Sequence, residues 1–477
     1  MGVKKNFGYN LILTLCNYLF PLITFPYVSR VLHADNVGLC GFVDGIINYL
    51  VLFSMLGIGS YGVREIARCG NDKERRSEVF SSLLSLNAIF TFVAVAVLVV
   101  STLCIGRLQP YREFLGIGVL KLVFNTFLIE WFFRGIEQFK YITLRTVAVN
   151  ACYVISVLLL VKDTEDTVTY YLLTTLVVVA NALFNILFSR RHCRFSIKKS
   201  RPRRHLASVF SFGYYTILTS MYTTFNVVFL GFVSTELQTG YFVTSTKLYT
   251  IIMAAFGAFT VVMVPRISAM LASGEKSKLQ GVADDTFDLL FLVSVPMIIF
   301  GFLFAPEIIN LVAGAGYEGA VLPFRIIVFL LLVVGMEQIV IQQFLMATTS
   351  NRSIMIVSTV GAAVGITLNL FVTPAYGAAG SATAWAISEV CVLVTGYFLM
   401  KKNIDVTLNS GRVYKALLSC APYVVLNLLL FLLPGTVGFW VAIVLNPLLF
   451  ILLNLKVNKD SVIAKHMLPV VGNLFKK

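Results

Sequence analysis

Long apolar stretches alternate with short polar or charged stretches along almost the whole chain. A helix needs about 20 residues to cross a bilayer, and charged residues, glycines and prolines mark where such helices end. On this basis the pattern predicts an all-α polytopic membrane protein with about fourteen transmembrane helices. They cover residues 8–30, 41–63, 79–105, 114–134, 143–162, 169–190, 208–232, 241–264, 283–304, 321–347, 354–373, 380–400, 414–433 and 437–456.

The first predicted helix begins with a sequence that returns in the second half of the chain. Residues 7–14, FGYNLILT, and residues 212–219, FGYYTILT, agree at six of eight positions, and VREIA at 63–67 matches PRISA at 265–269 more weakly. Six predicted helices separate the copies, so both halves enter the membrane in the same direction, as parallel repeats. The repeat predicts an N-terminal six-helix lobe over 1–190, a basic cytoplasmic linker over 191–207 and a C-terminal six-helix lobe over 208–400. Residues 401–477 then hold helices 13 and 14 and a cytoplasmic tail.

The composition supports a membrane protein, because 58% of the 477 residues are hydrophobic and only 13% are charged. The net charge of +15 is explained by the enrichment of Lys and Arg in cytoplasmic loops, so we expect no nucleic-acid partner. Cytoplasmic termini place most of the 38 Lys and Arg residues on the inner side. The basic residues that then fall outside are Arg30, Arg107, Arg112, Lys162 and Arg325.

Several kinds of chemistry have no signature in the chain. It has no G-x-x-x-x-G-K-[ST] sequence, so it cannot bind ATP through a P-loop. The eight cysteines are scattered, without the spacing of metal ligands. The predicted outer loops are too short to form the platform of a membrane glycosyltransferase or polymerase. We therefore expect no enzyme activity, no cofactor and no metal.

Three charged residues lie deep inside predicted helices: Lys121, Glu337 and Glu389. Exposing each of them to lipid would cost roughly 3 kcal/mol, so they must face protein or water. Either they have a function or they form buried structural pairs. Other charges lie nearer the ends of the predicted helices, with Arg30, Asp44 and Lys247 towards the outside and Glu130 and Arg134 towards the inside. Glu130 and Arg134 are four residues apart, which predicts a local ion pair that could also contact a substrate.

Polar residues recur at helical spacing in several of these helices. In the first, Asn10, Thr14, Asn17, Pro21 and Thr24 form one stripe. Asp44 and Asn48 lie one turn apart, as do Lys121 and Asn125. A membrane helix with one polar face lines a cavity or packs against a polar neighbour. The helix that begins the second half also carries polar residues, namely Thr216, Thr219, Ser220, Thr223 and Asn226. Because polar stripes begin both halves, we predict a cavity between the halves.

Several short motifs are spread along residues 7–400. They are Arg30-Val31-Leu32 with Gly38 and Phe42, Leu56-Gly57 with Arg64-Glu65-Ile66-Ala67, the run from Glu130 to Glu137, Gly314 to Tyr317, and Tyr376 to Ala382 followed by Glu389. Together they resemble the Wzx-type polysaccharide flippases, which belong to the multidrug/oligosaccharidyl-lipid/polysaccharide exporter superfamily. Two positions depart from the pattern. His33 stands where the family usually has Gly, and Arg134 stands where Gln is common.

The resemblance implies a secondary transporter of the bacterial inner membrane that serves surface polysaccharide assembly, such as O-antigen and lipopolysaccharide. It would flip undecaprenyl-pyrophosphate-linked oligosaccharide repeat units by alternating access. A pyrophosphate needs fixed cations and a glycan needs hydrogen-bonding walls. We predict a substrate-binding cavity formed by Arg30, Lys121, Asn125, Arg134, Lys247, Asn17 and Asn48, and ion-coupling by Asp44, Glu337 and Glu389.

The expected partners are the lipid-linked oligosaccharide and membrane lipid. A proton or sodium counter-ion and the glycan polymerase machinery are further candidates. The main alternative function is a cation-coupled multidrug exporter of the same superfamily, in which acidic residues should dominate the cavity. A membrane glycosyltransferase or polymerase is the more distant alternative.

Overall fold

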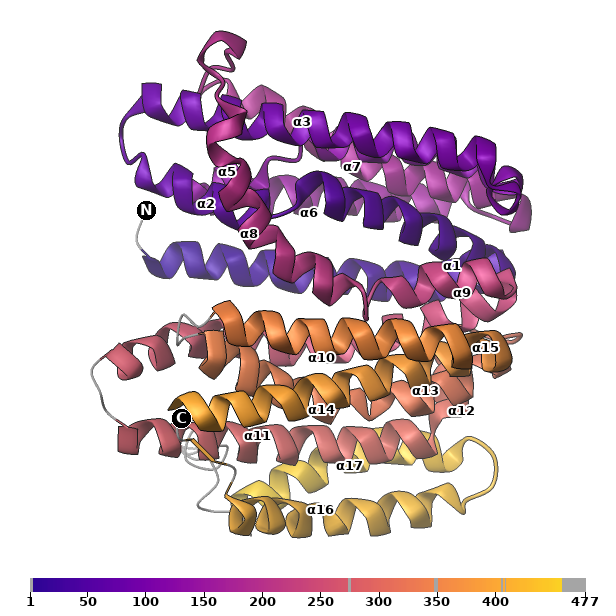
Figure 1. The fold of residues 1–477 in the computed structure, drawn as a ribbon. Coiled ribbons are helices and arrows are strands. Elements are labelled where there is room, and N and C mark those ends of the chain that lie inside the picture. Colours follow the sequence, from indigo (N-terminus) through magenta and orange to yellow (C-terminus); the bar gives the residue numbers. More distant parts are fainter. Residues whose placement is uncertain (1–2, 273–275, 347–350, 405, 408, 457–477) are drawn as a thin grey trace, which may run out of the picture. The chain divides into compact units, whose positions relative to one another are not determined.

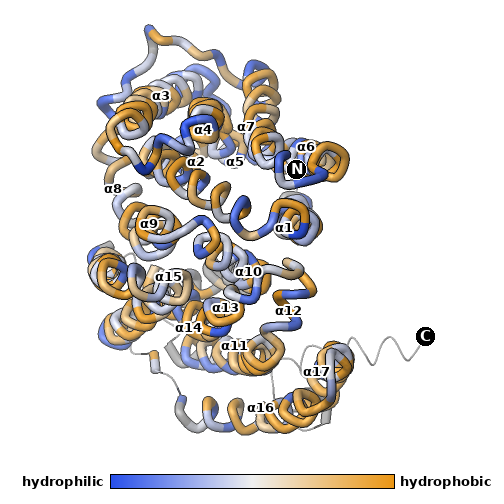
Figure 2. The backbone as a smooth tube through the Cα atoms, turned by 90° about the vertical axis from the view of Figure 1, so that its right-hand side faces the viewer, coloured by the Kyte–Doolittle hydropathy of each residue, from blue (hydrophilic) through white to orange (hydrophobic). Residues whose placement is uncertain are grey.

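The computed structural model describes residues 3–272, 276–346, 351–404, 406–407 and 409–456, and these residues form helices joined by short connections, with no strand among them. The helices are long, and apolar residues dominate their length (Figures 1 and 2). Within the described residues, nine helices are long and apolar enough to cross a membrane, or ten when one bent pair counts as a single span. The predicted all-α, multi-pass fold is confirmed.

The first half of the chain forms nine α-helices and three short 3₁₀ helices. The α-helices are α1 (Val3–Met55), α2 (Ile58–Arg68), α3 (Lys73–Cys104), α4 (Arg112–Asn125), α5 (Glu130–Gly135), α6 (Phe139–Leu160), α7 (Thr167–Ser189), α8 (Pro202–Ser220) and α9 (Phe225–Val233). The 3₁₀ helices are η1 (Gly106–Tyr111), η2 (Thr164–Asp166) and η3 (Ile197–Lys199).

The second half also consists of α-helices with short helices of other types between them. Its α-helices are α10 (Glu236–Ala272), α11 (Lys276–Leu303), α12 (Ala305–Val312), α13 (Val321–Val328), α14 (Leu330–Glu337), α15 (Asn351–Ile404), α16 (Ser410–Phe431) and α17 (Val437–Lys456). It also contains the 3₁₀ helix η4 (Glu318–Ala320) and the π-helix η5 (Gln338–Leu345).

Each of the fourteen predicted segments coincides with one helix or with consecutive helices, although their exact number as spans stays a prediction. The last residue of the segment 321–347 and the predicted cytoplasmic tail beyond residue 456 lie outside the described residues. The long helix α15 contains two predicted segments separated by a kink, and α1 contains the first predicted segment and most of the second, also separated by a kink.

The kinks in α1 and α15 have different residues at their centres. In α1 the only non-helical residue is His33, with φ 60° and ψ 173°, whereas Pro21 and Pro26 lie inside regular helix. In α15 the corresponding residue is Gly377, with φ 55° and ψ −128°. Glycine adopts such backbone angles readily, but a residue with a Cβ atom is strained there. The first kink therefore carries strain that the second avoids.

The chain divides into two compact units. Unit 1 contains residues 1–243, 313–316 and 365–381, and unit 2 contains residues 244–312, 317–364 and 382–477. One core of unit 1 gathers aromatic side chains around α5, including Phe80, Trp131 and Phe132, which are at most 3% exposed. The two six-helix lobes predicted from the repeat stay a prediction.

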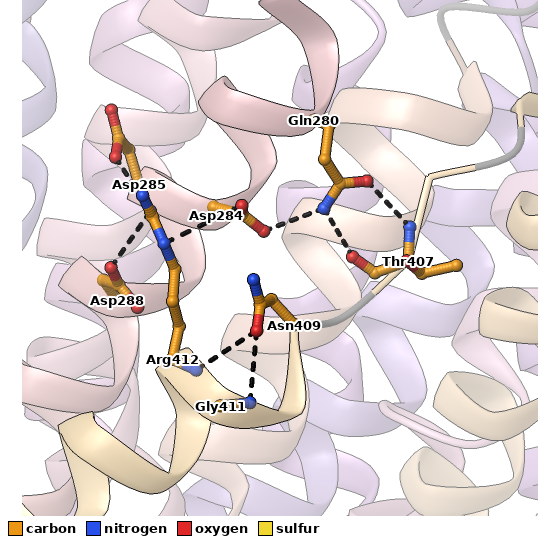
Figure 3. A network of polar contacts seen from close by, with 8 residues as sticks. All are labelled: Gln280, Asp284, Asp285, Asp288, Thr407, Asn409, Gly411 and Arg412. Atoms are coloured by element: carbon orange, nitrogen blue, oxygen red, sulfur yellow. Dashed lines mark hydrogen bonds and ion pairs between the residues drawn. The ribbon is translucent and has the colours of Figure 1, made fainter. Parts of the chain in front are cut away.

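The terminal helices α16 and α17 pack in unit 2. Arg412 at the start of α16 reaches three carboxylates of α11, at 3.8 Å from Asp284, 3.2 Å from Asp285 and 3.3 Å from Asp288 (Figure 3). Asn427 and Asn446 exchange side-chain hydrogen bonds of 2.8 and 2.9 Å between α16 and α17. Such bonds are typical of polar contacts that hold helices together in lipid. The helices also line an apolar pocket of about 420 Å³ beside α11.

Candidate functional site

The clearest charged pair inside a span joins Asp44 of α1 to Lys121 of α4, both in unit 1. Lys121 Nζ donates to Asp44 Oδ1 at 2.6 Å. The lysine side chain is only 13% exposed, and the aspartate side chain is 36% exposed. The pair therefore holds a cation within the span and neutralises it, leaving one side of the carboxylate accessible.

The approach of α4 to α1 explains how the two side chains meet. A Cβ atom on Gly118 would lie 2.5 Å from Ile47 Cδ1, so only glycine allows this helix contact. Gly118 and Lys121 lie three residues apart on one face of α4, as Asp44 and Ile47 do on α1. The close contact one turn away therefore brings the ammonium and the carboxylate together. The buried side chain of Tyr171 from α7 lies beside Asp44.

A second charged cluster lies where α5, α6 and α7 meet. Glu130 Oε1 accepts a hydrogen bond of 2.9 Å from Arg145 Nη2, and Glu130 Oε2 lies 3.5 Å from Arg134 Nη2. Arg145 is 7% exposed and also donates to Thr146 and to the side-chain oxygen of Asn185. The ion pair between Glu130 and Arg134 is thus present, but the stronger and more buried partner of Glu130 is Arg145.

Sequence reasoning missed the role of Arg145. Near the cytoplasmic end of a predicted helix it counted as one more positive charge on the inner side. In the structure Arg145 stabilises the break between α4 and α5. It donates a hydrogen bond to Asn185, and Asn185 in turn donates one to the backbone carbonyl of Leu128, which lies in that break. One signal in the sequence could have indicated a buried partner. Arg145 lies two residues into the predicted segment 143–162, where a cationic side chain has to form an ion pair or extend to the water.

Unit 2 contains a pair of carboxyl groups with like charge. Glu337 ends α14, and Glu389 lies in the second part of α15 at 3% exposure. Their side chains lie within hydrogen-bonding reach of each other. Trp385 Nε1 donates to Glu389 Oε1 at 2.8 Å, whereas Oε2 of each glutamate is buried without a hydrogen-bond partner in the described structure. Sequence reasoning named both residues but could not pair them across 52 positions.

The local structure around this carboxyl pair is unusual. Directly after Glu337 the chain forms the π-helix η5, whose turns are wider than those of an α-helix. Such segments are rare and occur frequently at functional sites. On the other side, Trp385 stacks edge-on against Tyr249 with ring centroids 5.3 Å apart. An arrangement of two facing carboxyl groups can hold a proton or a small cation between them.

The remaining predicted site residues occupy several places. In unit 1, Arg30 is exposed and packs along Gly314, Asn17 and Asn48 are exposed on α1, and Asn125 is half-buried at the end of α4. Arg134 is exposed at the end of α5. Lys247 is half-buried on α10, in unit 2. The structure thus joins Asp44 to Lys121 and Glu337 to Glu389, and their association into one cavity stays a prediction.

No group of three or more His, Cys, Asp or Glu side chains that could hold a metal ion occurs in the part of the chain that the structure describes. The eight cysteines are free thiols.

Comparison with known proteins finds a matching family and similar individual chains. The family described as polysaccharide biosynthesis protein matches residues 3–271. The chain is 24% identical over 332 residues to a protein of Escherichia coli (strain K12) named "Putative O-antigen transporter", a match that covers 69% of this chain and 79% of the relative.

Solved structures show the same fold. The lipid II flippase MurJ in an inward closed conformation matches with a TM-score of 0.74 and 13% identity, covering 95% of this chain and 99% of MurJ. An inward-facing multidrug resistance transporter of the MATE family, from the MOP superfamily, matches with a TM-score of 0.62 and 14% identity. The match covers 81% of this chain and 94% of the transporter. The chain therefore shares the fold of these transporters.

Proposed function

Because the chain belongs to the polysaccharide biosynthesis protein family, we propose that it flips a lipid-linked oligosaccharide across the bacterial inner membrane. The substrate would be a repeat unit on undecaprenyl pyrophosphate, carried from the cytoplasmic to the outer leaflet by alternating access for surface polysaccharide assembly. The protein would perform no catalysis, and both termini would be cytoplasmic. The E. coli relative named as an O-antigen transporter supports this assignment.

The observation that carries the proposal is the cation Lys121 within a span. A pyrophosphate is recognised through charge-assisted hydrogen bonds from fixed cations. Lys121 is held in place by a single 2.6 Å contact with Asp44, which remains partly accessible. Transfer of this ammonium from the carboxylate to a pyrophosphate oxygen would exchange one ionic partner for another. Arg30 and Lys247 are the other cations that we place in the cavity, with Asn17, Asn48, Asn125 and Arg134 as its hydrogen-bonding groups.

The membrane potential supplies one source of energy for such transport. Moving two negative charges out of a negative-inside cell releases roughly 4 to 5 kcal/mol per 100 mV. The facing carboxyl groups of Glu337 and Glu389 supply a second, because exchange of a proton or sodium ion there would couple transport to an ion gradient. Asp44, already engaged by Lys121, would join ion exchange only when the lysine binds substrate.

The first test measures lipid-linked oligosaccharide in cells that lack the protein, recording its amount, its completeness and the leaflet that contains it. Complete repeat units stranded on the cytoplasmic leaflet are the expected result. Unchanged glycolipid together with increased sensitivity to cationic dyes would contradict the proposal and favour a drug exporter. That second candidate has one specific observation in its favour, the buried acidic pair in a fold shared with a multidrug transporter.

The second test concerns the cations. Lys121→Ala and Lys247→Ala are expected to reduce glycan export per molecule of protein in the membrane. Lys162→Ala is the matched control, because Lys162 is an exposed lysine at the end of α6. Export at the control level in both cavity variants would contradict the role of fixed cations.

A further inference from the structure

A polar cavity of about 830 Å³ lies in unit 1, and none of its lining residues belongs to the charged pairs described above. It is lined by the last turns of α2, the connection to α3 with the first turns of that helix, and the linker that leads into α8. Its volume falls within the range of small-molecule binding sites. These elements come from the ends of the predicted segments 41–63, 79–105 and 208–232, on the side predicted to be cytoplasmic.

The lining of the cavity is dominated by positive charge. Six basic residues line it, against four acidic ones: the basic residues are Arg64, Arg68, Arg75, Lys198, Arg201 and Arg204, and the acidic residues are Glu65, Asp72, Glu74 and Glu78. Glu65 forms an ion pair with Arg68 at 2.8 Å, and Glu78 lies 3.9 Å from Arg201. The Asp72 carboxylate accepts hydrogen bonds from two backbone N–H groups at the start of α3.

Three of the lining arginines make no ion pair with a carboxylate in the described part of the chain: Arg64, Arg75 and Arg204. The guanidinium of Arg64 lies 5.9 Å from the centroid of the Phe212 ring, so an aromatic face rather than an acid positions it. Near Arg204, the buried ring of His205 hydrogen-bonds to the Tyr61 hydroxyl at 2.9 Å. This bond joins the start of α8 to α2 within the lining of the cavity, and so ties together two of the helices that carry its basic residues.

We propose that this cavity binds the phosphate group of a lipid headgroup, with Arg64 and Arg204 as its main ligands. Arginine suits this role because its planar guanidinium matches phosphate oxygens and stays charged. A cavity at the ends of spans allows the lipid chains to remain in the bilayer, and basic pockets on the cytoplasmic side of membrane proteins bind anionic headgroups in this way.

The same phosphate chemistry could come from two lipids. One is an anionic phospholipid of the surrounding membrane. The other is the pyrophosphate-linked glycolipid, which would dock here before it enters the cavity, and this version rests on the proposed function. Both lipids place phosphate oxygens against Arg64 and Arg204.

The test uses the full-length protein, purified in neutral detergent, and measures binding by titration with three probes: phosphatidylglycerol, a polyprenyl diphosphate and soluble inorganic pyrophosphate. Arg64→Gln and Arg204→Gln are expected to weaken binding of the preferred lipid about tenfold or more, since each removes a charge-assisted hydrogen bond. Arg203→Gln is the matched control, because it removes the same charge one residue away from Arg204 and does not line the cavity. Thermal unfolding without ligand verifies that all variants are folded.

The outcomes separate the sources. Tighter binding of phosphatidylglycerol, sensitive to Arg64 and Arg204 but not to Arg203, identifies a phospholipid site, and this result would stand even if the chain flipped no glycolipid. The same sensitivity with tighter binding of the polyprenyl diphosphate identifies a docking site for the substrate. Equal affinity for soluble pyrophosphate and both lipids would overturn the assignment to a lipid headgroup. Equal loss in all three variants, or no binding of any probe, would overturn the site itself.

Discussion

The two halves of the chain place charged side chains inside the membrane in opposite ways. In the first half, Lys121 and Asp44 have unlike charges and form a 2.6 Å ion pair. In the second half, Glu337 and Glu389 have like charges and face each other, and Oε2 of each lacks a partner among the described residues. The sequence singled out all four residues without predicting which of them pair, and the structure shows that the two pairs solve the same energetic problem differently.

This difference separates the roles that the two pairs can have. An unlike pair is neutral by itself, so it is stable without a ligand and can exchange one partner for a substrate group. Two carboxylates in a low-dielectric site repel each other strongly, and the pair becomes stable only with a proton or a cation between them. We therefore propose that the pair in the first half would hold an anionic substrate, and that the pair in the second half would hold a coupling ion.

The largest effect is expected from removing one charge of the carboxyl pair. In Glu389→Gln the amide oxygen can still accept the hydrogen bond from the Trp385 N–H group. The uncharged amide no longer repels Glu337, so the pair needs no proton or cation to be stable. We expect its thermal stability to equal or exceed that of the unaltered protein, while export loses its response to a proton or sodium gradient. Vesicle transport with imposed gradients measures this.

Glu113→Gln, at an exposed carboxylate in the first turn of α4, serves as the control for that experiment. Gradient-dependent transport that survives in both Glu337→Gln and Glu389→Gln would remove the carboxyl pair from the transport cycle. The coupling ion would then have to bind elsewhere, and Asp44 is the remaining predicted coupling residue.

The unlike pair should respond in the opposite direction. Lys121→Met leaves Asp44 without its partner and is expected to lower the free energy of unfolding by about 1 to 3 kcal/mol, towards the lower end because the aspartate side chain is 36% exposed. Combining it with Asp44→Asn should recover most of that loss without restoring export. Thermal unfolding of the two single variants and the double variant gives the coupling. Additive losses would mean that the ion pair contributes nothing to stability.

The sequence predicted the helical segments well because hydropathy and span length are local properties of the chain. It could not predict which of the buried charged residues pair, because pairing depends on tertiary packing. Lys121 reaches Asp44 because α4 approaches α1 closely at Gly118, and Glu389 reaches Glu337 because of how α15 lies against α14. Arg145 was overlooked because a basic residue near the inner end of a helix satisfies the charge rule whether or not it is buried. The backbone of α1 departs from helix at His33, whereas both of its prolines lie in regular helix.

The kinks extend the comparison between the halves to the backbone, because α15 uses glycine where α1 uses histidine. At Gly377 a Cβ atom would lie 2.6 Å from Gln238 Oε1, which accepts a hydrogen bond of 3.0 Å from the Ala378 backbone. Gly377→Ala therefore introduces both strain and a clash, and we expect a loss of about 1 to 3 kcal/mol in unfolding free energy. An unchanged melting temperature would show that the kink tolerates a side chain.

His33→Gly should have the smallest effect and the opposite sign. The backbone of His33, at φ 60° and ψ 173°, lies in a region that is essentially restricted to glycine and costs about 1 to 3 kcal/mol in other residues. Glycine removes this strain but loses roughly 0.5 to 1 kcal/mol through the greater freedom of the unfolded chain. Since the histidine side chain is exposed, little packing is lost, and we expect a net gain of about 1 kcal/mol. His33→Ala separates the causes, because alanine removes the imidazole and keeps the strain. A gain in thermal stability with glycine alone would confirm strain at the kink, and equal gains with both residues would assign the cost to the imidazole.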